Sequence, residues 1–268
     1  MTPCTIGFIG AGHIAGAIIR GMVGSGRVAP EQIGVYDVLP ASMERYAKAG
    51  HPTFSSIPEL MKACPIVVLS VKPQNMGDVL PRVKEGLTSR TILVSVAAGV
   101  TAQRIKGVVG ECHLILAMPN TPVELGRGAI ALGRVEPTTA EQMEQVKALF
   151  STCALVEEIP HEKMPEVIAV NGSSPAFVYK MADIVAKQAA GAGIDEGVAL
   201  RLFCQTLIGS AEMMLRSGDP AALVAQVATP GGTTEAALAA MDAHGFAESL
   251  RAGMELCARR ARELNQGK

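Results

Sequence analysis

The sequence predicts an α/β protein: a doubly wound parallel sheet over residues 1–160, followed by an all-helical domain over residues 161–268. In the first part, short runs that are apolar at nearly every position alternate with helical patterns, as buried parallel strands and their crossover helices do. After about residue 160 the strand signal ends and only helical patterns follow. A chain of 268 residues is long enough for two such domains.

The strand predictions begin with "TIGFIG" (5–10), an apolar run that ends in glycine. Further buried strands are expected at "IGVYD" (33–37), "IVVLSV" (66–71), "TILVSV" (91–96) and "LILAMP" (114–119). Two later runs, "GAIALGRV" (128–135) and "CALVEEIP" (153–160), are expected to be edge strands that close the sheet.

Helical patterns separate these strands. The first, "HIAGAIIRGMVGSG", places apolar residues at helical spacing directly after the first strand. In "SIPEL" the sequence contains a capping box, with Ser56 as the N-cap and Glu59 three residues later. The other helices are expected at residues 40–50, 75–87, 101–109 and 140–150.

The C-terminal part is a series of helices at residues 173–193, 195–218, 219–227, 234–245 and 246–266, the second with Asp195 as its N-cap. Helices this apolar cannot all bury their faces in one small bundle. Met213, Met214 and Leu215 are examples of the surplus. Apolar surface of this kind predicts a subunit interface, and hence a homo-oligomer.

Composition excludes several classes of partner. The net charge is −1 without long runs of one sign, so neither nucleic acid nor an anionic membrane is an expected partner. The six cysteines are scattered and form no C-x-x-C pair, which favours reduced thiols and no metal site. The N-terminal stretch is uncharged until Arg20, lacks the early positive charge of an export signal and is interrupted by glycines. We therefore expect a soluble, cytoplasmic protein.

The turn after the first strand carries a dinucleotide-binding pattern. Residues Gly10 to Ala15 form G-x-G-x-x-A between a strand and a helix, the context that a Rossmann-type site requires. Asp37 ends the second strand, where a carboxylate can accept hydrogen bonds from the adenine ribose. The expected cofactor is therefore NADH or NADPH, and its contacts here are Ile9, Gly10, Ala11, Gly12, His13, Ile14 and Asp37.

Ligands of such sheets lie beyond the carboxyl ends of the strands. Three segments end there: "SVKPQ" (70–74), "SVAAG" (95–99) and "AMPNTP" (117–122). The side chain of Lys72 could meet a phosphate or point to solvent. The further cofactor contacts expected in the first two segments are Ser70, Val71, Lys72, Pro73, Val96, Ala97 and Ala98.

One helical region is interrupted by "VATPGGTTEAAL" (227–238). Proline and paired glycines end a helix, and a threonine can start the next, so an ordinary helix–helix turn is one interpretation. The other is an anion cradle, because glycines expose backbone N–H groups at a helix N-terminus, where a carboxylate or phosphate binds well.

Six segments together resemble the pyrroline-5-carboxylate reductase family: "GFIGAGHIA" (7–15), "VKPQ" (71–74), "SVAAGV" (95–100), "MPNTP" (118–122), "NGSSPAFVY" (171–179) and "TPGGTTEAAL" (229–238). The resemblance implies NAD(P)H-dependent reduction of the cyclic imine 1-pyrroline-5-carboxylate to L-proline. It also implies a dimer with interlocked C-terminal helices, often assembled into larger rings. Ser174 stands where the family often has glycine, and the charged pair often found before the glycine loop is absent. Asp37 differs from the family's usual residue and points toward NADH.

Imine reduction needs a bound carboxylate, an aligned ring carbon and stabilised charge at the nitrogen, and it needs no nucleophile or metal. The expected substrate contacts are Asn120, Thr229, Gly231, Gly232, Thr233 and Thr234. The N–H groups from Gly231 to Thr234 would bind the carboxylate, and the Thr234 hydroxyl, the expected catalytic group, would reach the ring nitrogen. Alternatively, Thr234 is only a helix N-cap.

Two other functions stay open at this point. One is a reductase of a β-hydroxy acid with the same two-domain plan; Lys180 could be its lysine, although the accompanying asparagine is missing. The other is a non-enzymatic dinucleotide sensor, because fold alone does not imply activity. Substrate-dependent loss of NADH absorbance separates all three.

Overall fold

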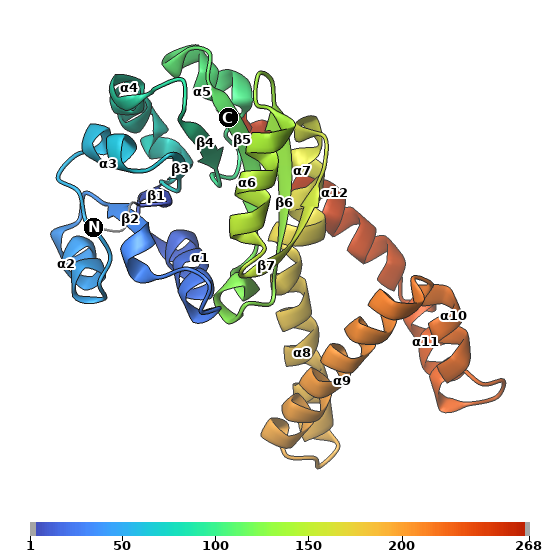
Figure 1. The fold of residues 1–268 in the computed structure, drawn as a ribbon. Coiled ribbons are helices and arrows are strands. Elements are labelled where there is room, and N and C mark those ends of the chain that lie inside the picture. Colours follow the sequence, from blue (N-terminus) through green and yellow to red (C-terminus); the bar gives the residue numbers. More distant parts are fainter. Residues whose placement is uncertain (1–3, 266–268) are drawn as a thin grey trace. The chain divides into compact units, whose positions relative to one another are not determined.

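The computed structural model describes residues 4–265, which form two compact units (Figure 1). The first unit runs to Pro175 and takes up the chain again from Cys257, and the second comprises Ala176–Leu256. The return of the C-terminal segment to the first unit had no signal in the sequence. The expected functional boundary at residue 160 stays a prediction, since these units only record which residues pack together.

The first unit contains a seven-stranded sheet in the order β2-β1-β3-β4-β5-β6-β7. Its strands are β1 (Ile6–Ile9), β2 (Ile33–Tyr36), β3 (Ile66–Leu69), β4 (Ile92–Ser95), β5 (His113–Pro119), β6 (Gly128–Val135) and β7 (Ala154–Glu158). All seven predicted strands are present. The first five run parallel, so their carboxyl ends share one edge of the sheet.

The position of β6 was predicted wrongly. It does not lie at an edge but pairs antiparallel with β5 on one side and parallel with β7 on the other. Both of its faces are largely buried, whereas β7 is the edge strand and leaves Leu155 58% exposed. All neighbouring strands of the sheet are therefore parallel except β5 and β6, which are antiparallel. An apolar run cannot distinguish an edge from an interior strand when both are covered on their faces.

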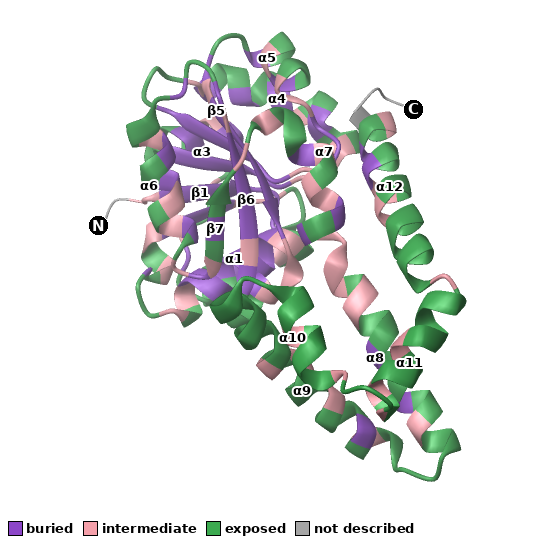
Figure 2. Ribbon diagram, turned by 90° about the vertical axis from the view of Figure 1, so that its right-hand side faces the viewer, coloured by how far each residue is buried: buried purple, intermediate pink, exposed green. Residues whose placement is uncertain are grey.

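Two apolar cores cover the two faces of the sheet. Alternate strand residues such as Phe8 and Val94 pack with the helices α1 (His13–Gly24) and α6 (Ala140–Phe150). The intervening residues such as Leu69 and Leu93 pack on the other face with α3 (Ile57–Ala63), α4 (Met76–Gly86) and α5 (Ala102–Val109). Figure 2 shows most of the sheet buried between these layers, whereas the edge strand β7 is largely exposed. Burial on both faces explains why the strand sequences are apolar at consecutive positions.

The helices of the first unit are α1 (His13–Gly24), α2 (Pro40–Lys48), α3 (Ile57–Ala63), α4 (Met76–Gly86), α5 (Ala102–Val109), α6 (Ala140–Phe150) and α7 (Met164–Val167). Short 3₁₀ helices are η1 (Pro30–Gln32), η2 (Pro73–Asn75), η3 (Thr121–Leu125) and η4 (His161–Lys163), and η5 (Ile168–Gly172) is a π-helix.

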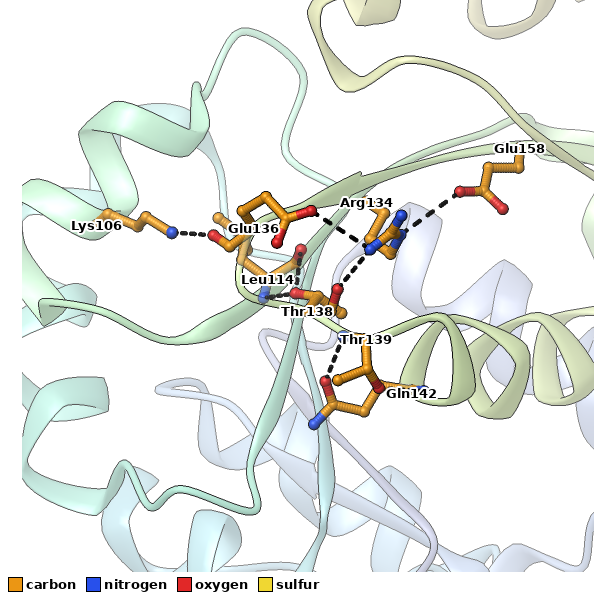
Figure 3. A network of polar contacts seen from close by, with 8 residues as sticks. All are labelled: Lys106, Leu114, Arg134, Glu136, Thr138, Thr139, Gln142 and Glu158. Carbon is orange, nitrogen blue, oxygen red and sulfur yellow. Dashed lines mark hydrogen bonds and ion pairs between the residues drawn. The ribbon is translucent and has the colours of Figure 1, made fainter.

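Capping residues start several of these helices. Ser56 accepts the Glu59 N–H as predicted, but the Glu59 carboxylate bonds Ser55 and not Ser56, so the expected capping box is only half formed. A complete box, which the sequence analysis did not identify, starts α6: Thr139 accepts the Gln142 N–H at 3.2 Å and donates its own N–H to the Gln142 side chain at 2.9 Å (Figure 3).

A polar network joins the turn before α6 to the start of β5 (Figure 3). The buried Thr138 hydroxyl accepts the Leu114 N–H at 2.7 Å and donates to the Leu114 carbonyl at 3.0 Å. Arg134 donates to the Thr138 carbonyl at 2.8 Å, and Lys106 donates to the Glu136 carbonyl. These residues lie at the amino end of β5, so the network holds the fold and is separate from the edge where ligands of such sheets bind.

The second unit is built from α8 (Ser174–Gly191), α9 (Glu196–Ser217), α10 (Pro220–Val227), α11 (Thr233–Ala243) and α12 (Phe246–Asn265); α8 begins and α12 ends in the first unit. Asp195 caps α9 by accepting the Val198 N–H, as predicted. Figure 2 shows most residues of α9, α10 and α11 exposed. Their apolar side chains therefore lack a core within the described part of this unit.

Candidate functional site

The turn between β1 and α1 has the geometry of a phosphate cradle. Gly10 has φ +93°, which a side chain rarely adopts, and an added Cβ would lie 2.8 Å from Val71. Gly12 is the N-cap of α1, has no side-chain cap and meets nothing within 4 Å of an added Cβ. The helix N-terminus is therefore uncapped and its backbone can be approached closely, the arrangement that accommodates a pyrophosphate.

Asp37 fixes this turn from the neighbouring strand. One carboxylate oxygen accepts the Ala11 N–H at 2.6 Å, and the other accepts the Leu39 N–H at 2.9 Å. Each oxygen keeps a second lone pair, so the carboxylate can still accept a ligand hydroxyl. The sequence predicted the position of Asp37 but not this bond to the turn, which depends on the pairing of β1 with β2.

Ser70 holds the other side of the same turn. Its buried hydroxyl lies 2.7 Å from the Gly10 carbonyl and 3.1 Å from the Ile9 carbonyl, and it donates its single proton to this pair. The Ser70 side chain therefore holds the backbone of this turn in place, and we assign it a positioning role.

A cavity of about 900 Å³ opens beside the cradle. Most predicted cofactor contacts of this region line it, while Ala11, His13, Ile14 and Pro73 do not. Two basic side chains, Lys72 and Arg82, face the same cavity as Asp37. The predicted residues among its lining are Ile9, Gly10, Gly12, Asp37, Ser70, Val71 and Lys72; the lining residues missed by the sequence analysis include Val38, Leu39, Asn75, Asp78 and Arg82.

A smaller hollow of about 250 Å³ lies at the ends of β4 and β5. Ala97 lines it, whereas the predicted contacts Val96 and Ala98 line neither cavity. Ser95 lines it too; its hydroxyl is buried and has no hydrogen-bond partner among the described residues. The loop after β4 thus borders a hollow with one unsatisfied polar group.

The amide of Asn120 is engaged inside the first unit. Its oxygen accepts the Ala129 N–H at 2.9 Å, and its nitrogen donates to the side chain of Asn171 at 2.9 Å. One amide proton is left for a ligand. The predicted substrate contact stays a prediction, while the bonds show that Asn120 ties the end of β5 to β6 and η5.

Asn171, the partner of Asn120, is a further residue of this region for which no role was predicted. It is 9% exposed, and its nitrogen donates to the carbonyls of Met118 and Ala129 at 2.6 and 3.0 Å. It sits in the π-helix η5, an irregularity that is frequent at functional sites. Its only signal was its place at the start of "NGSSPAFVY".

The segment after Asn120 is also held against α1. An added Cβ on Gly21 would lie 2.1 Å from the Val123 carbonyl oxygen, so η3 and α1 approach closely. Arg20 donates to Glu124 at 2.9 Å on the exposed side of this contact. That hydrogen bond lowers the pKa of Glu124 and raises the pKa of Arg20. The helix α1 and the loop after β5 therefore pack directly against each other.

In the second unit, the "TPGGTT" segment is a tight turn between α10 and α11. Gly231 has φ +72°, and the Gly232 N–H donates to the Thr229 carbonyl at 2.9 Å. Gly232 is the N-cap of α11, so the alternative that made Thr234 the N-cap is wrong: Thr234 lies in the first turn. Glycine serves here because an added Cβ on Gly232 would lie 2.8 Å from the Thr229 hydroxyl.

Some backbone N–H groups of this turn are already hydrogen-bonded within the protein, and others could still bind a ligand. The Gly231 N–H donates to the Glu235 carboxylate at 2.7 Å, and Gly232 is bonded as described above. Within residues 4–265 the structure gives the N–H groups of Thr233 and Thr234 no acceptor, as expected in the first turn of a helix. An anion at this turn would therefore meet Thr233 and Thr234 first.

The described residues contain no cluster of three or more His, Cys, Asp or Glu side chains that could hold a metal ion. Burial raises the pKa of the Cys112 thiol, and that of Cys153 to about 11, so these thiols are protonated at neutral pH. The assembled groups can bind a dinucleotide and an anion, and they suit a reaction that needs positioning more than a protein nucleophile.

Two family models match the chain. One, described as "Pyrroline-5-carboxylate reductase dimerisation", covers residues 161–264, and the other, described as "NADP oxidoreductase coenzyme F420-dependent", covers residues 5–99. The first match covers the helical C-terminal part, and the second covers strands β1 to β4 with the turn after β1.

Curated relatives match almost end to end. The chain is 33% identical to pyrroline-5-carboxylate reductase 3 of Danio rerio over 97% of this chain and 91% of that protein. It is 32% identical to pyrroline-5-carboxylate reductase of Escherichia coli over 97% of this chain and 98% of that protein.

Solved structures agree. The chain superposes with a TM-score of 0.89 on a pyrroline-5-carboxylate reductase from Coxiella burnetii at 27% identity, covering 98% of this chain and 99% of that one. A Plasmodium falciparum pyrroline carboxylate reductase with NADP bound gives a TM-score of 0.88 at 25% identity, with 99% of each chain covered.

Proposed function

The chain belongs to the pyrroline-5-carboxylate reductase family, and on that premise we propose how its own residues hold the two reactants. It is an oxidoreductase that reduces 1-pyrroline-5-carboxylate to L-proline with NAD(P)H, the last step of proline biosynthesis. The observation that carries this function is the match to reductases of that name over nearly the whole of both chains. The β-hydroxy acid reductase and the sensor are not favoured.

The residues of the first unit fit a nicotinamide dinucleotide. Gly12 leaves open space at an uncapped helix N-terminus, and the cavity beside it is large enough for an extended ligand. We assign the pyrophosphate to the N-terminus of α1 and the adenine ribose to Asp37. When bound, the cofactor supplies the hydride. The protein residues orient it and exclude water.

The choice between the two cofactors is a finer proposal. The Asp37 carboxylate is held at the cavity by Ala11 and Leu39, so its negative charge opposes a 2′-phosphate there. Lys72 and Arg82 line the same cavity and act in the opposite direction. We infer a preference for NADH because Asp37 lies at the end of β2, where the ribose of a Rossmann-type ligand binds.

The substrate carboxylate is assigned to the turn before α11. The N–H groups of Thr233 and Thr234 point to this role because they have no acceptor among residues 4–265 and lie at a helix N-terminus, which attracts anions. The hydroxyl of Thr234 is the group that we assign to the ring nitrogen, where positive charge must be stabilised as the imine is reduced. Asn120 we assign mainly to positioning the loop after β5, since its amide is already engaged.

Self-association is suggested by the dimerisation match over residues 161–264. The apolar residues Met213, Met214 and Leu215 are 52%, 43% and 79% exposed in the protomer, and we infer that a second copy covers them. Larger rings, cytoplasmic location and the lack of nucleic-acid partners remain proposals, the last resting on the net charge of −1.

The helix α9 is long and apolar enough to bear on the expectation that the protein does not bind membranes. By length and composition alone, α9 could cross a membrane, although we expected a soluble protein. It carries Arg201 and Glu212 in its interior, and charges of this kind are costly in a bilayer. Because the dimerisation match includes α9, we infer that its apolar residues serve the subunit interface.

The activity assay tests the whole proposal. With 1-pyrroline-5-carboxylate, loss of absorbance from NADH or NADPH should appear and should yield L-proline in equal amount. A β-hydroxy acid in its place should give no reaction with the oxidised cofactor. Cofactor binding without turnover on any of these compounds would leave only the sensor.

A further inference from the structure

The turn that we assign to the substrate carboxylate already binds a carboxylate of this chain. Glu235, in the first turn of α11, accepts the Gly231 N–H with its Oε2 atom at 2.7 Å. Its side chain comes from the same helix whose N-terminus is assigned to the substrate. The chain itself thus places a carboxylate at the backbone of this turn.

The position of Glu235 explains this bond. A glutamate at the third position of a helix ordinarily reaches back to the N-cap N–H. Here the N-cap is Gly232, and its N–H is already bonded to the Thr229 carbonyl. Glu235 therefore reaches one residue further, to Gly231, and its charge lies at the positive end of the α11 dipole.

We propose that Glu235 is a specificity-determining residue whose carboxylate competes with the substrate carboxylate for this turn. The inference rests on the proposed function. A second anion gains less at a helix N-terminus whose dipole is already offset, so Glu235 raises the KM for 1-pyrroline-5-carboxylate. A ring without a carboxylate does not compete with Glu235, and its binding does not depend on this side chain.

The test uses the full-length enzyme with Glu235→Gln, which removes the charge and keeps an oxygen that can accept the Gly231 N–H. The matched control is Glu248→Gln, because Glu248 lies in the first turn of α12 and is likewise exposed. Steady-state kinetics are measured with 1-pyrroline-5-carboxylate and with 1-pyrroline, the same ring without the carboxylate.

Glu235→Gln should lower the KM for 1-pyrroline-5-carboxylate about three- to tenfold, the range expected for removing one negative charge from a helix N-terminus, with kcat within about twofold. The KM for 1-pyrroline should not change, and Glu248→Gln should leave both constants unchanged. Because Glu235 is an exposed charge, salt screens its repulsion of the substrate carboxylate. The difference in KM between wild type and Glu235→Gln should therefore shrink at high ionic strength.

An unchanged or raised KM for 1-pyrroline-5-carboxylate in Glu235→Gln would overturn the competition. An equal fall in KM for 1-pyrroline would do the same, since it would show a general loosening of the turn. Thr234→Ala separates this failure from that of the proposed function. If Thr234→Ala lowers kcat while Glu235→Gln changes nothing, only the competition is lost. If neither variant changes the kinetics, the turn is not the substrate site.

Discussion

The two units differ in where their apolar residues are buried. In the first unit, every residue of β1, β3 and β4 is buried between helices of the same chain. In the second, the 22-residue α9 buries only Ala199, and α10 and α11 bury no residue. The first unit is thus stabilised by its own core, whereas α9, α10 and α11 leave most of their apolar surface exposed in the described protomer, where a partner could cover it.

The same difference divides the two proposed binding regions. The cradle, Asp37 and Ser70 are held by strand pairing and by a closely packed helix. The turn before α11 lies between two helices that bury none of their residues in the protomer. We therefore expect variants of the first unit to act through local packing, and variants of the second to act through association or through direct contact with substrate.

The largest effect should come from Gly21→Ala. An added Cβ would lie 2.1 Å from the Val123 carbonyl oxygen, and backbone cannot yield as a side-chain tip can. We expect a loss of about 3 kcal/mol in the free energy of unfolding of the first unit, measured by urea denaturation. The control is Gly24→Ala on the same helix, where nothing lies within 4 Å. If both variants have the same stability, α1 and η3 do not pack as closely as described.

Thr234→Ala tests whether the second unit takes part in chemistry. Loss of a hydrogen bond to a charged group costs about 1.5–3 kcal/mol, so kcat should fall about tenfold to a hundredfold. The KM for the dinucleotide should stay the same, and Thr234→Ser should keep most of the activity because the hydroxyl remains. Normal turnover in Thr234→Ala would remove the proposed catalytic role.

Leu215→Glu tests the dependence of the second unit on association. Leu215 is 79% exposed in the protomer, and burying a charge in its place should cost at least about 2 kcal/mol at an interface, or roughly a 30-fold weaker dimer. Analytical ultracentrifugation measures the shift. Leu155→Glu, at a residue 58% exposed on the edge strand β7, should leave the assembly unchanged. Equal effects of the two variants would contradict the contrast between the units.

Asp37→Asn tests the cofactor proposal with little change of shape. The amide keeps an oxygen for the Ala11 N–H but loses the charge that opposes a 2′-phosphate. The ratio of kcat/KM for NADH to that for NADPH should fall about tenfold, equivalent to about 1.4 kcal/mol. Glu44→Gln, an exposed carboxylate of α2 paired with Lys48, serves as the control. An unchanged ratio would place the ribose away from Asp37.

The smallest effect should come from Glu124→Gln. The hydrogen bond from Arg20 lowers the pKa of Glu124 below its ordinary value of 4.5, so the folded state favours the charged carboxylate. This stabilisation is present above pH 4.5 and is lost as the pH falls through the lower folded value. The variant should melt slightly lower than wild type at pH 7, and the gap should close in acid and at high salt. A gap that grows in acid would contradict this sign.

Much of this protein was determined by the sequence alone. Seven runs predicted seven strands, and in β1, β3 and β4 the reason is that burial on both faces requires apolar residues at consecutive positions. The glycine pattern after β1 predicted a turn with special backbone geometry, and Gly10 has φ +93° there. The contacts of this turn and of Asp37 with a cofactor stay a prediction. The excess of apolar residues in the last helices predicted an interface, and the family motifs predicted the reaction.

Tertiary structure decided the rest, because long-range pairing has no local signature. β6 lies inside the sheet only because β7 pairs beyond it. The amide of Asn120 is engaged by Asn171, 51 residues away in the chain, and the sequence pattern does not reveal this partner. At the turn before α11, whether a backbone N–H has an acceptor depends on folded geometry. The Gly231 N–H donates to Glu235, whereas those of Thr233 and Thr234 have no acceptor in the part of the chain that the structure describes.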